Sequence, residues 1–355
     1  MAGKELKWYS IFVVLFGAIL SIADPITDVL TLVEFYRTGH TTWFGVGLTF
    51  IILPSLFFLL INYVINEDTW SDDEEYQSKA CKFTRVFFLG CNPLLPACLK
   101  LRTLYCYLKK LKKLRQVNIT DQTDEDLDDL LGVRKYAVVA EAALEAAPQF
   151  IIQLYAMAVQ QQSVTIIQMV SLPVSFLSLA WASTVGDEFV RSAEGHFHFS
   201  VKHTVLLFVT HLFILSSRLV AVALFTVSYK WWVTIVLIFH CTVITICDRV
   251  LLCRAAHNFY GLRRSVSFFC LHWLRDDLPF CDYGGYERLN MQLASNVLFV
   301  IENITLILLF YFSHFPHTWY SLPVTICVCL FAVLGAVMRL THFYYLSPVK
   351  KESDG

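Results

Sequence analysis

Apolar runs of membrane-spanning length recur along the whole chain, and this pattern leaves few folds open. A helix needs about 20 apolar residues to cross about 30 Å of hydrocarbon. By that criterion we predict eight crossings, at roughly 8–36, 41–65, 133–160, 163–189, 203–229, 231–254, 291–313 and 319–345. The composition, 56% hydrophobic and only 16% charged, agrees with a membrane protein. The sequence therefore predicts an all-α polytopic membrane protein.

Two further apolar stretches are too broken to cross the membrane. The first, near 83–101, is interrupted by Pro93 and Pro96, and the second, near 265–280, contains Arg275. Irregular backbone at membrane depth is tolerated only where protein or a cavity shields it. We expect each stretch to form a membrane-embedded half-helix.

The order of these segments repeats. Two crossings, a half-helix and two more crossings fill residues 1–200, and the same order fills 201–346, followed by a short tail at 347–355. Pseudo-symmetric repeats of this kind occur in membrane transporters, which place a site between the repeats. We therefore predict two pseudo-symmetric repeats and a cytosolic tail.

Charged loops set the expected orientation. Basic residues gather in the loops near 66–132 and 253–290, whereas the alternate loops are very short. The positive-inside rule then places the long loops and both termini in the cytosol. The sequon at Asn118 is accordingly expected to be cytosolic, and the sequon at Asn303 lies within a predicted span.

The sequence carries no recognisable apparatus for enzymatic chemistry. The net charge is −1, which does not indicate a nucleic-acid partner. The nucleotide-binding, nucleophile-elbow and zinc-protease motifs do not occur, so we expect no enzyme, no cofactor and no metal site.

Charged residues inside the predicted spans are the candidates for function. An isolated charge at the bilayer centre costs about 2.5–3.5 kcal/mol on insertion scales, so each needs a partner or a wet cavity. Residues four apart share one helix face, as Asp24 and Asp28 do, and as Glu141 and Glu145 do. We hypothesise that these carboxylates face Arg218 across a helix interface. These residues either form a polar path with a role in transport or hold the helices together without a transport role.

Two aspartates mark weak caspase-site candidates. Asp124 ends an Asp-x-x-Asp match in the acidic run "TDQTDEDLDDL", which otherwise has the composition of a solvated loop. Asp354 lies in the final "SPVKKESDG", where the first aspartate of the pattern is missing.

Several of these segments resemble the XK-related family. The similar segments are "ADPITDVLTLVEFY", "ALEAAPQFIIQLYAM", "SLAWAS" and "SRLVAVALF", and the resemblance extends over nearly the whole chain. It implies eight spans in two halves, each with a half-helix. It also implies ATP-independent phospholipid scrambling at the plasma membrane, with phosphatidylserine exposure in the apoptotic members.

The resemblance further implies site residues and partners. The charged path corresponds to Asp24, Asp28, Glu141, Glu145 and Arg218, and an acidic position of the seventh span corresponds to Glu302. Trp43 matches an aromatic residue at the outer end of that path, and the same position also suits an interfacial anchor. Expected partners are phospholipids and a single-span chaperone of the basigin type or a lipid-transfer protein.

Three functions stay open on the sequence. The first is a scramblase, although the short tail departs from the caspase-released tail of scramblase members. The second is a non-catalytic membrane partner or scaffold of a lipid-transfer or transporter complex. The third is a transporter for a small solute, which the repeat would permit.

Overall fold

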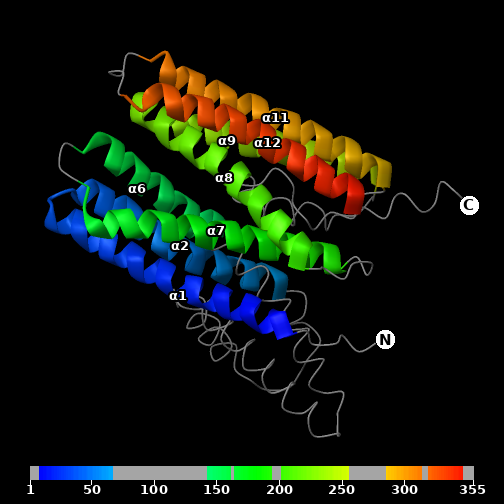
Figure 1. Ribbon diagram of the computed structural model, residues 1–355, viewed down its shortest axis with the longest axis horizontal. Helices are drawn as coiled ribbons and strands as arrows, with labels where there is room; N and C mark the ends of the chain where they lie inside the picture. Colours follow the sequence, from blue (N-terminus) through cyan, green and yellow to red (C-terminus); the bar gives the residue numbers. More distant parts are fainter. Residues whose placement is uncertain are drawn as a thin grey trace, which may run out of the picture. The chain divides into compact units, whose positions relative to one another are not determined.

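The computed structural model describes residues 8–66, 142–160, 164–193, 201–255, 285–313 and 319–346, and every regular element in these ranges is a helix (Figure 1). The elements are α1 (Trp8–Arg37), α2 (Thr41–Asn66), the π-helix η2 (Ala142–Ala146), α6 (Ala147–Val159), α7 (Ile166–Ala193), α8 (Val201–Tyr229), α9 (Trp232–Ala255), α11 (Gly285–Tyr311) and α12 (Ser321–Leu346). The prediction of an all-α architecture is confirmed for this part of the chain.

Six helical segments are long and apolar enough to cross a membrane. They lie in α1, in η2 with α6, and in α7, α8, α11 and α12. The apolar stretches found in the other two helices are shorter, at Thr41–Pro54 in α2 and Trp232–Ile246 in α9. The chain is thus a multi-pass membrane protein, and the full count of eight crossings stays a prediction. Both predicted half-helices fall outside the described residues.

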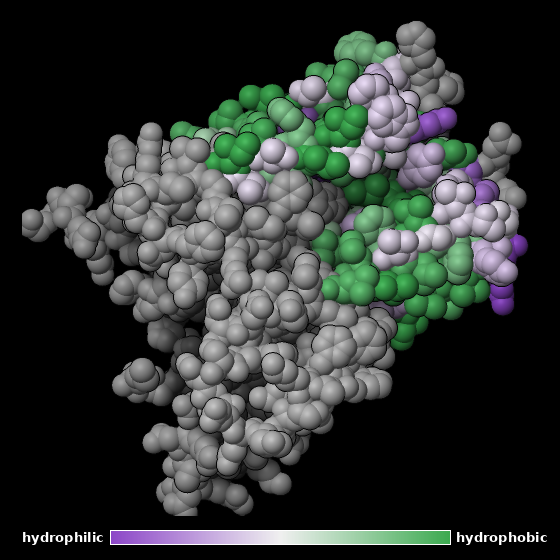
Figure 2. Space-filling view, turned by 180° about the vertical axis from the view of Figure 1, so that it is seen from behind, coloured by the Kyte–Doolittle hydropathy of each residue, from purple (hydrophilic) through white to green (hydrophobic). Residues whose placement is uncertain are grey.

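Apolar side chains cover much of the described surface, as Figure 2 shows. On α12 most of the large exposed hydrophobic residues are three or four positions apart, and they are Leu322, Ile326, Leu330, Val333, Leu334 and Val337. That spacing places them on one helix face. An apolar face of this length suits contact with lipid tails rather than with water.

The chain divides into two compact units. The first comprises Met1–Gln149 and Ile166–Ala182, and the second comprises Phe150–Thr165 and Ser183–Gly355. The boundary falls within α6 and within α7, so each of these helices contributes to both units. The predicted repeats at 1–200 and 201–346 concern the order of segments in the sequence, and they stay a prediction.

In the first unit a tight turn joins α1 to α2. Gly39 takes a positive φ of 82°, a conformation that glycine adopts without strain. The amide of His40 then donates to the carbonyl of Phe35 across 2.8 Å, which closes the end of α1. Helix α2 contacts both α1 and η2.

A π-helical turn opens the segment that contains Glu145. The turn η2 ends at Ala146, and Pro148 follows at the second position of α6. Because proline has no backbone N–H, the carbonyl of Leu144 receives no regular helix bond from that position. Single π-helical turns often interrupt α-helices at functional sites, and the turn at Glu145 agrees with that tendency.

The second unit is built on the mutual packing of α8, α11 and α12. Its buried apolar cluster comprises Ala221, Val222, Leu224 and Phe225 of α8, Leu306, Ile307 and Phe310 of α11, and Val328 of α12. Gly335 of α12 lies against Ile214 of α8, where an added Cβ would come within 2.8 Å of Ile214 Cγ1 and 3.1 Å of its backbone nitrogen. A small residue here lets the two helices approach closely.

Candidate functional site

The first unit contains a buried carboxylate, Asp28, that accepts hydrogen bonds from hydroxyl groups of α7. The Oγ of Ser175 lies 3.1 Å from Asp28 Oδ1, and the Oγ of Ser171 lies 3.5 Å from the same atom. Asp28 is only 1% exposed, and both serines are fully buried. Two hydroxyl donors from a neighbouring helix therefore replace part of the water that a carboxylate requires.

Asp28 belongs to a polar face of α1 that faces inward. Asp24, Asp28 and Thr31 follow one another at intervals of four and three residues, and all three are buried. On α7 the buried polar residues Gln168, Ser171, Ser175 and Ser178 recur with similar spacing. We call these two faces together the polar seam of the first unit. It lies within helices of membrane-spanning length.

Glu145 and Gln149 add polar groups to the first unit. Glu145 is buried within the π-turn, at 5% exposure, and Gln149 follows one helical turn later. The Nε2 of Gln149 donates to the backbone carbonyl of Gly47 on α2 across 2.6 Å. This bond ties the start of α6 to α2. Glu141, the other glutamate of the predicted pair, lies outside the described residues.

The second unit holds an ion pair between two helices. Nη1 of Arg218 on α8 lies 3.0 Å from Oε1 of Glu302 on α11, and it also donates to Oδ1 of Asn303 across 3.2 Å. The side chains of Arg218 and Glu302 are 1% and 14% exposed. Coulomb attraction at short range offsets the loss of hydration that burial imposes on each charge.

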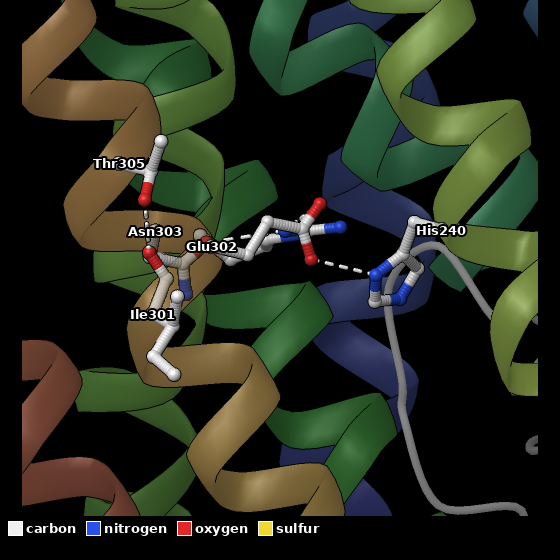
Figure 3. A network of polar contacts seen from close by, with 6 residues as sticks. His240, Ile301, Glu302, Asn303 and Thr305 are labelled. Carbon is white, nitrogen blue, oxygen red and sulfur yellow. Dashed lines mark hydrogen bonds and ion pairs between the residues drawn. The ribbon is translucent and has the colours of Figure 1, made fainter.

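A histidine completes this cluster. Glu302 points from α11 toward His240 of α9, and its Oε2 lies 2.6 Å from Nδ1 of the imidazole (Figure 3). A neutral imidazole must carry its hydrogen on Nδ1 to donate to the carboxylate here. We call Arg218, His240, Glu302 and Asn303 the Glu302 cluster. It links α8, α9 and α11.

A second acid–histidine pair occurs in the same unit. Nε2 of His211 on α8 lies 2.9 Å from Oδ2 of Asp187 on α7, and both residues are buried. His211 and Arg218 are seven residues apart and therefore lie on nearly the same face of α8. This face of α8 thus meets two separate carboxylates.

Trp43 lies in an aromatic cluster at the turn between α1 and α2. Its ring stacks on His40, with centroids 4.0 Å apart, and meets the edge of Phe35 at 5.5 Å. Trp43 is half-buried, whereas Phe35 is buried. The position at the end of two membrane helices suits either of the predicted roles, an outer gate or an interfacial anchor.

The structure brings some predicted residues together and leaves other relationships as predictions. Arg218 contacts Glu302 within the second unit, and Asp24, Asp28 and Glu145 are buried within the first. The predicted strip joining those three carboxylates to Arg218 stays a prediction, because Arg218 belongs to the other unit. Asp124 and Asp354 lie outside the described residues. In the described part of the chain, no group of three or more metal-ligating side chains gathers.

Several polar residues of these sites had not been predicted. They are His240 and Asn303 in the Glu302 cluster, Asp187 and His211 in the second pair, Ser171 and Ser175 beside Asp28, and Gln149. Two of these residues could have been found from the sequence. Asp187 and His211 are polar residues within or at the end of predicted spans, and such residues need partners.

The family comparison covers nearly the full length of this chain. The model of the family described as XK-related protein matches residues 12–348. The match includes the polar seam and the Glu302 cluster, as well as every helix described above except the first four residues of α1.

Proposed function

The chain belongs to the XK-related family, and we propose that it is a phospholipid scramblase of the plasma membrane. In this proposal lipids, phosphatidylserine among them, move between the leaflets without ATP and without any covalent change. The protein would act as a path rather than as an enzyme. The polar headgroup would follow buried polar residues while the acyl chains remain in the bilayer.

The observation that supports this proposal best is the polar seam. Asp28 is buried within a membrane-length helix, and Ser175 donates to it from α7 across 3.1 Å. A headgroup in hydrocarbon needs the same compensation as a buried charge, namely hydrogen-bonding groups in place of water. A row of carboxylate, hydroxyl and amide groups can supply such bonds in succession.

The proposed path uses residues from both units. Asp24, Asp28 and Glu145 contribute from the first unit, as does Glu141, which lies outside the described residues. Arg218 and Glu302 contribute from the second. Carboxylates and a guanidinium suit a zwitterionic headgroup, because its ammonium and phosphate groups require opposite charges. Trp43 would guard the outer end of the path.

The alternative is a non-catalytic membrane partner, and the Glu302 cluster favours it. Its carboxylate contacts basic side chains from two other helices at 3.0 and 2.6 Å, a geometry that also suits a static brace. In this case the chain would support a lipid-transfer protein or a transporter. The partners expected under either proposal include a single-span chaperone of the basigin type.

A lipid-bleaching experiment tests the proposal. The purified full-length chain is reconstituted into liposomes that contain a fluorescent phospholipid, and dithionite is added outside. Scrambling exposes inner-leaflet lipid, so bleaching should pass well beyond half. Bleaching that stops at half, with the protein folded and a basigin-type chaperone supplied, would contradict the proposal.

A double variant distinguishes a role of these glutamates in a lipid path from a purely structural role. Glu141→Gln with Glu145→Gln removes two charges and keeps the approximate side-chain volumes. A slower bleaching rate with unchanged thermal stability supports the path. Lower stability with an unchanged rate supports a brace.

A further inference from the structure

Three exposed tryptophans lie at one end of the second unit. Trp231 and Trp232 lie where α8 turns into α9, and their rings stack with centroids 4.5 Å apart. Trp319 lies two residues before the start of α12. The exposed fractions of the three side chains are 62%, 51% and 89%. Large apolar side chains that are exposed together mark a surface that contacts another molecule or a membrane.

Contacts within the second unit place these tryptophans at the same end of its helices. The Oγ of Ser228, next to the end of α8, lies 2.9 Å from the Oγ of Ser313, just beyond the end of α11. The start of α9 follows the end of α8 after a two-residue turn. Near the start of α12, Val324 packs against the buried cluster that includes Phe310 near the end of α11. The starts of α9 and α12 therefore lie beside the ends of α8 and α11.

Exposed apolar side chains continue along each helix from these tryptophans. On α9 they extend from Ile235 to Ile246, and on α12 they extend from Leu322 to Val337. The stretch on α12 covers roughly 22 Å at 1.5 Å per residue, which fits within a hydrocarbon layer of about 30 Å. The tryptophans thus lie where the surface that suits lipid tails ends.

Lys230 adds a positive charge to this end of the unit. It is exposed in the turn between α8 and α9, directly before Trp231. Its backbone takes a φ of 49°, a left-handed conformation that glycine adopts with less strain. Of the residues that the structure describes, it alone takes a positive φ without being glycine. A lysine in a backbone conformation that favours glycine indicates a use for its side chain at this position.

We propose that Lys230, Trp231, Trp232 and Trp319 anchor this end of the second unit in the headgroup layer of a phospholipid leaflet, with the Lys230 ammonium on a lipid phosphate. We call these four residues the aromatic anchor. Tryptophan suits this layer because its ring is apolar and its indole N–H donates a hydrogen bond. Lysine suits it because its ammonium attracts an anionic lipid. In the orientation predicted from the sequence, this is the outer leaflet. The anchor does not depend on the proposed scrambling, since a chain that moves no lipid would be held in the same way.

Fluorescence quenching at two depths tests the position of the aromatic anchor. The full-length chain is reconstituted into phosphatidylcholine liposomes whose acyl chains carry bromine either near the headgroup or near the bilayer centre. The signal of the three tryptophans is the difference between this chain and a triple variant, Trp231→Phe with Trp232→Phe and Trp319→Phe. Shallow bromine should quench this signal about twofold more strongly than deep bromine, because the indoles lie near the headgroups. Equal quenching at the two depths, or no quenching at either, would overturn the proposal. The second result would mean that water or another protein covers this end.

A brominated anionic lipid tests the contact between Lys230 and phosphate. The probe is phosphatidylglycerol with shallow bromine, and phosphatidylcholine with the same bromine at the same mole fraction is the reference. Phosphatidylglycerol should be enriched about fivefold beside the three tryptophans, as one lysine near an anionic lipid allows, and should quench their signal more strongly. High salt should reduce this excess, because it screens the attraction. Equal quenching by the two lipids at low salt would overturn the contact.

Three variants assign the excess quenching to one lysine. Lys230→Gln removes the charge and should abolish the excess. Lys202→Gln is the matched control, because Lys202 is an exposed lysine at the opposite end of α8, roughly 42 Å away at 1.5 Å per residue. Lys230→Gly should also abolish the excess, and it should not lower the unfolding temperature, because glycine relieves the left-handed backbone. An excess that persists in either Lys230 variant, or that disappears in Lys202→Gln, would overturn the assignment.

Discussion

Arg218 on α8 and Glu302 on α11 form an ion pair inside a bundle of membrane helices, with 3.0 Å between Nη1 and Oε1. The pair joins two of the three helices that form the core of the second unit. Asn303 and His240 provide further hydrogen-bonding groups at the two ends of the pair. Removing one partner of a buried ion pair is strongly destabilising, because the other charge then stays in a nonpolar region without the opposite charge.

We predict that Glu302→Gln lowers the free energy of unfolding by about 3–5 kcal/mol, because it leaves the buried guanidinium without its counterion. Arg218→Met alone should lower the free energy of unfolding by a similar amount, because the buried carboxylate of Glu302 then loses the guanidinium beside it. The double variant should recover part of the loss, because neither charge then remains. Thermal unfolding in detergent gives all three values. Strictly additive effects would show that the two residues are not coupled.

Ser175→Ala should lower stability by about 1–2 kcal/mol, because Asp28 loses its shorter hydroxyl contact and retains the one from Ser171. Ser216→Ala removes a partly buried hydroxyl that bonds within α8, outside the polar seam, and serves as the control. The scrambling rate of Ser175→Ala should also fall below that of the control. Equal unfolding temperatures for the two variants would argue against a role for Ser175 in holding Asp28.

Gly335→Ala should destabilise the second unit by about 1–3 kcal/mol, since the added methyl group would crowd the side chain and backbone of Ile214. Gly45→Ala is the control, because an added Cβ at that position meets nothing within 4 Å. Removing a helical glycine there should be neutral or slightly stabilising. An unchanged unfolding temperature for Gly335→Ala would show that α8 and α12 do not pack this closely.

The sequon at Asn303 should carry no glycan in cells. Asn303 is fully buried within α11, and its side-chain oxygen accepts a hydrogen bond from Arg218. Treatment with a peptide N-glycosidase should therefore leave the electrophoretic mobility unchanged. Thr305→Ala provides the control, because it removes the sequon at an exposed position. A mobility shift that Thr305→Ala abolishes would contradict the burial of Asn303.

The helices could be predicted from the sequence because a membrane span depends on length and local composition alone. The predicted segments at 203–229 and 319–345 agree with α8 and α12 to within a few residues. The pairing of Arg218 with Glu302 is a tertiary relationship, and several acidic residues in other spans were equally eligible partners. Spacing along one helix does not rank partners on other helices.

The hydroxyl and imidazole groups gave weaker signals. Serine in a membrane helix often bonds to the carbonyl one turn earlier, so Ser171 and Ser175 did not indicate a partner on α1. His240 is a lone histidine in an apolar span, which on sequence alone predicts neither a ligand nor an ion pair. Its contact with Glu302 appears only when α9 and α11 are seen together (Figure 3).

The central claim is that the polar seam carries lipid headgroups, and the scrambling rate of Asp28→Asn in liposomes tests it most directly. The variant should be about 10–100-fold slower than the wild type, because a charged hydrogen-bonding group worth about 1.5–3 kcal/mol is lost from the path. Glu34→Gln removes a carboxylate elsewhere on α1 and should scramble at the wild-type rate. A rate for Asp28→Asn equal to that of Glu34→Gln, with both proteins folded, would contradict the account.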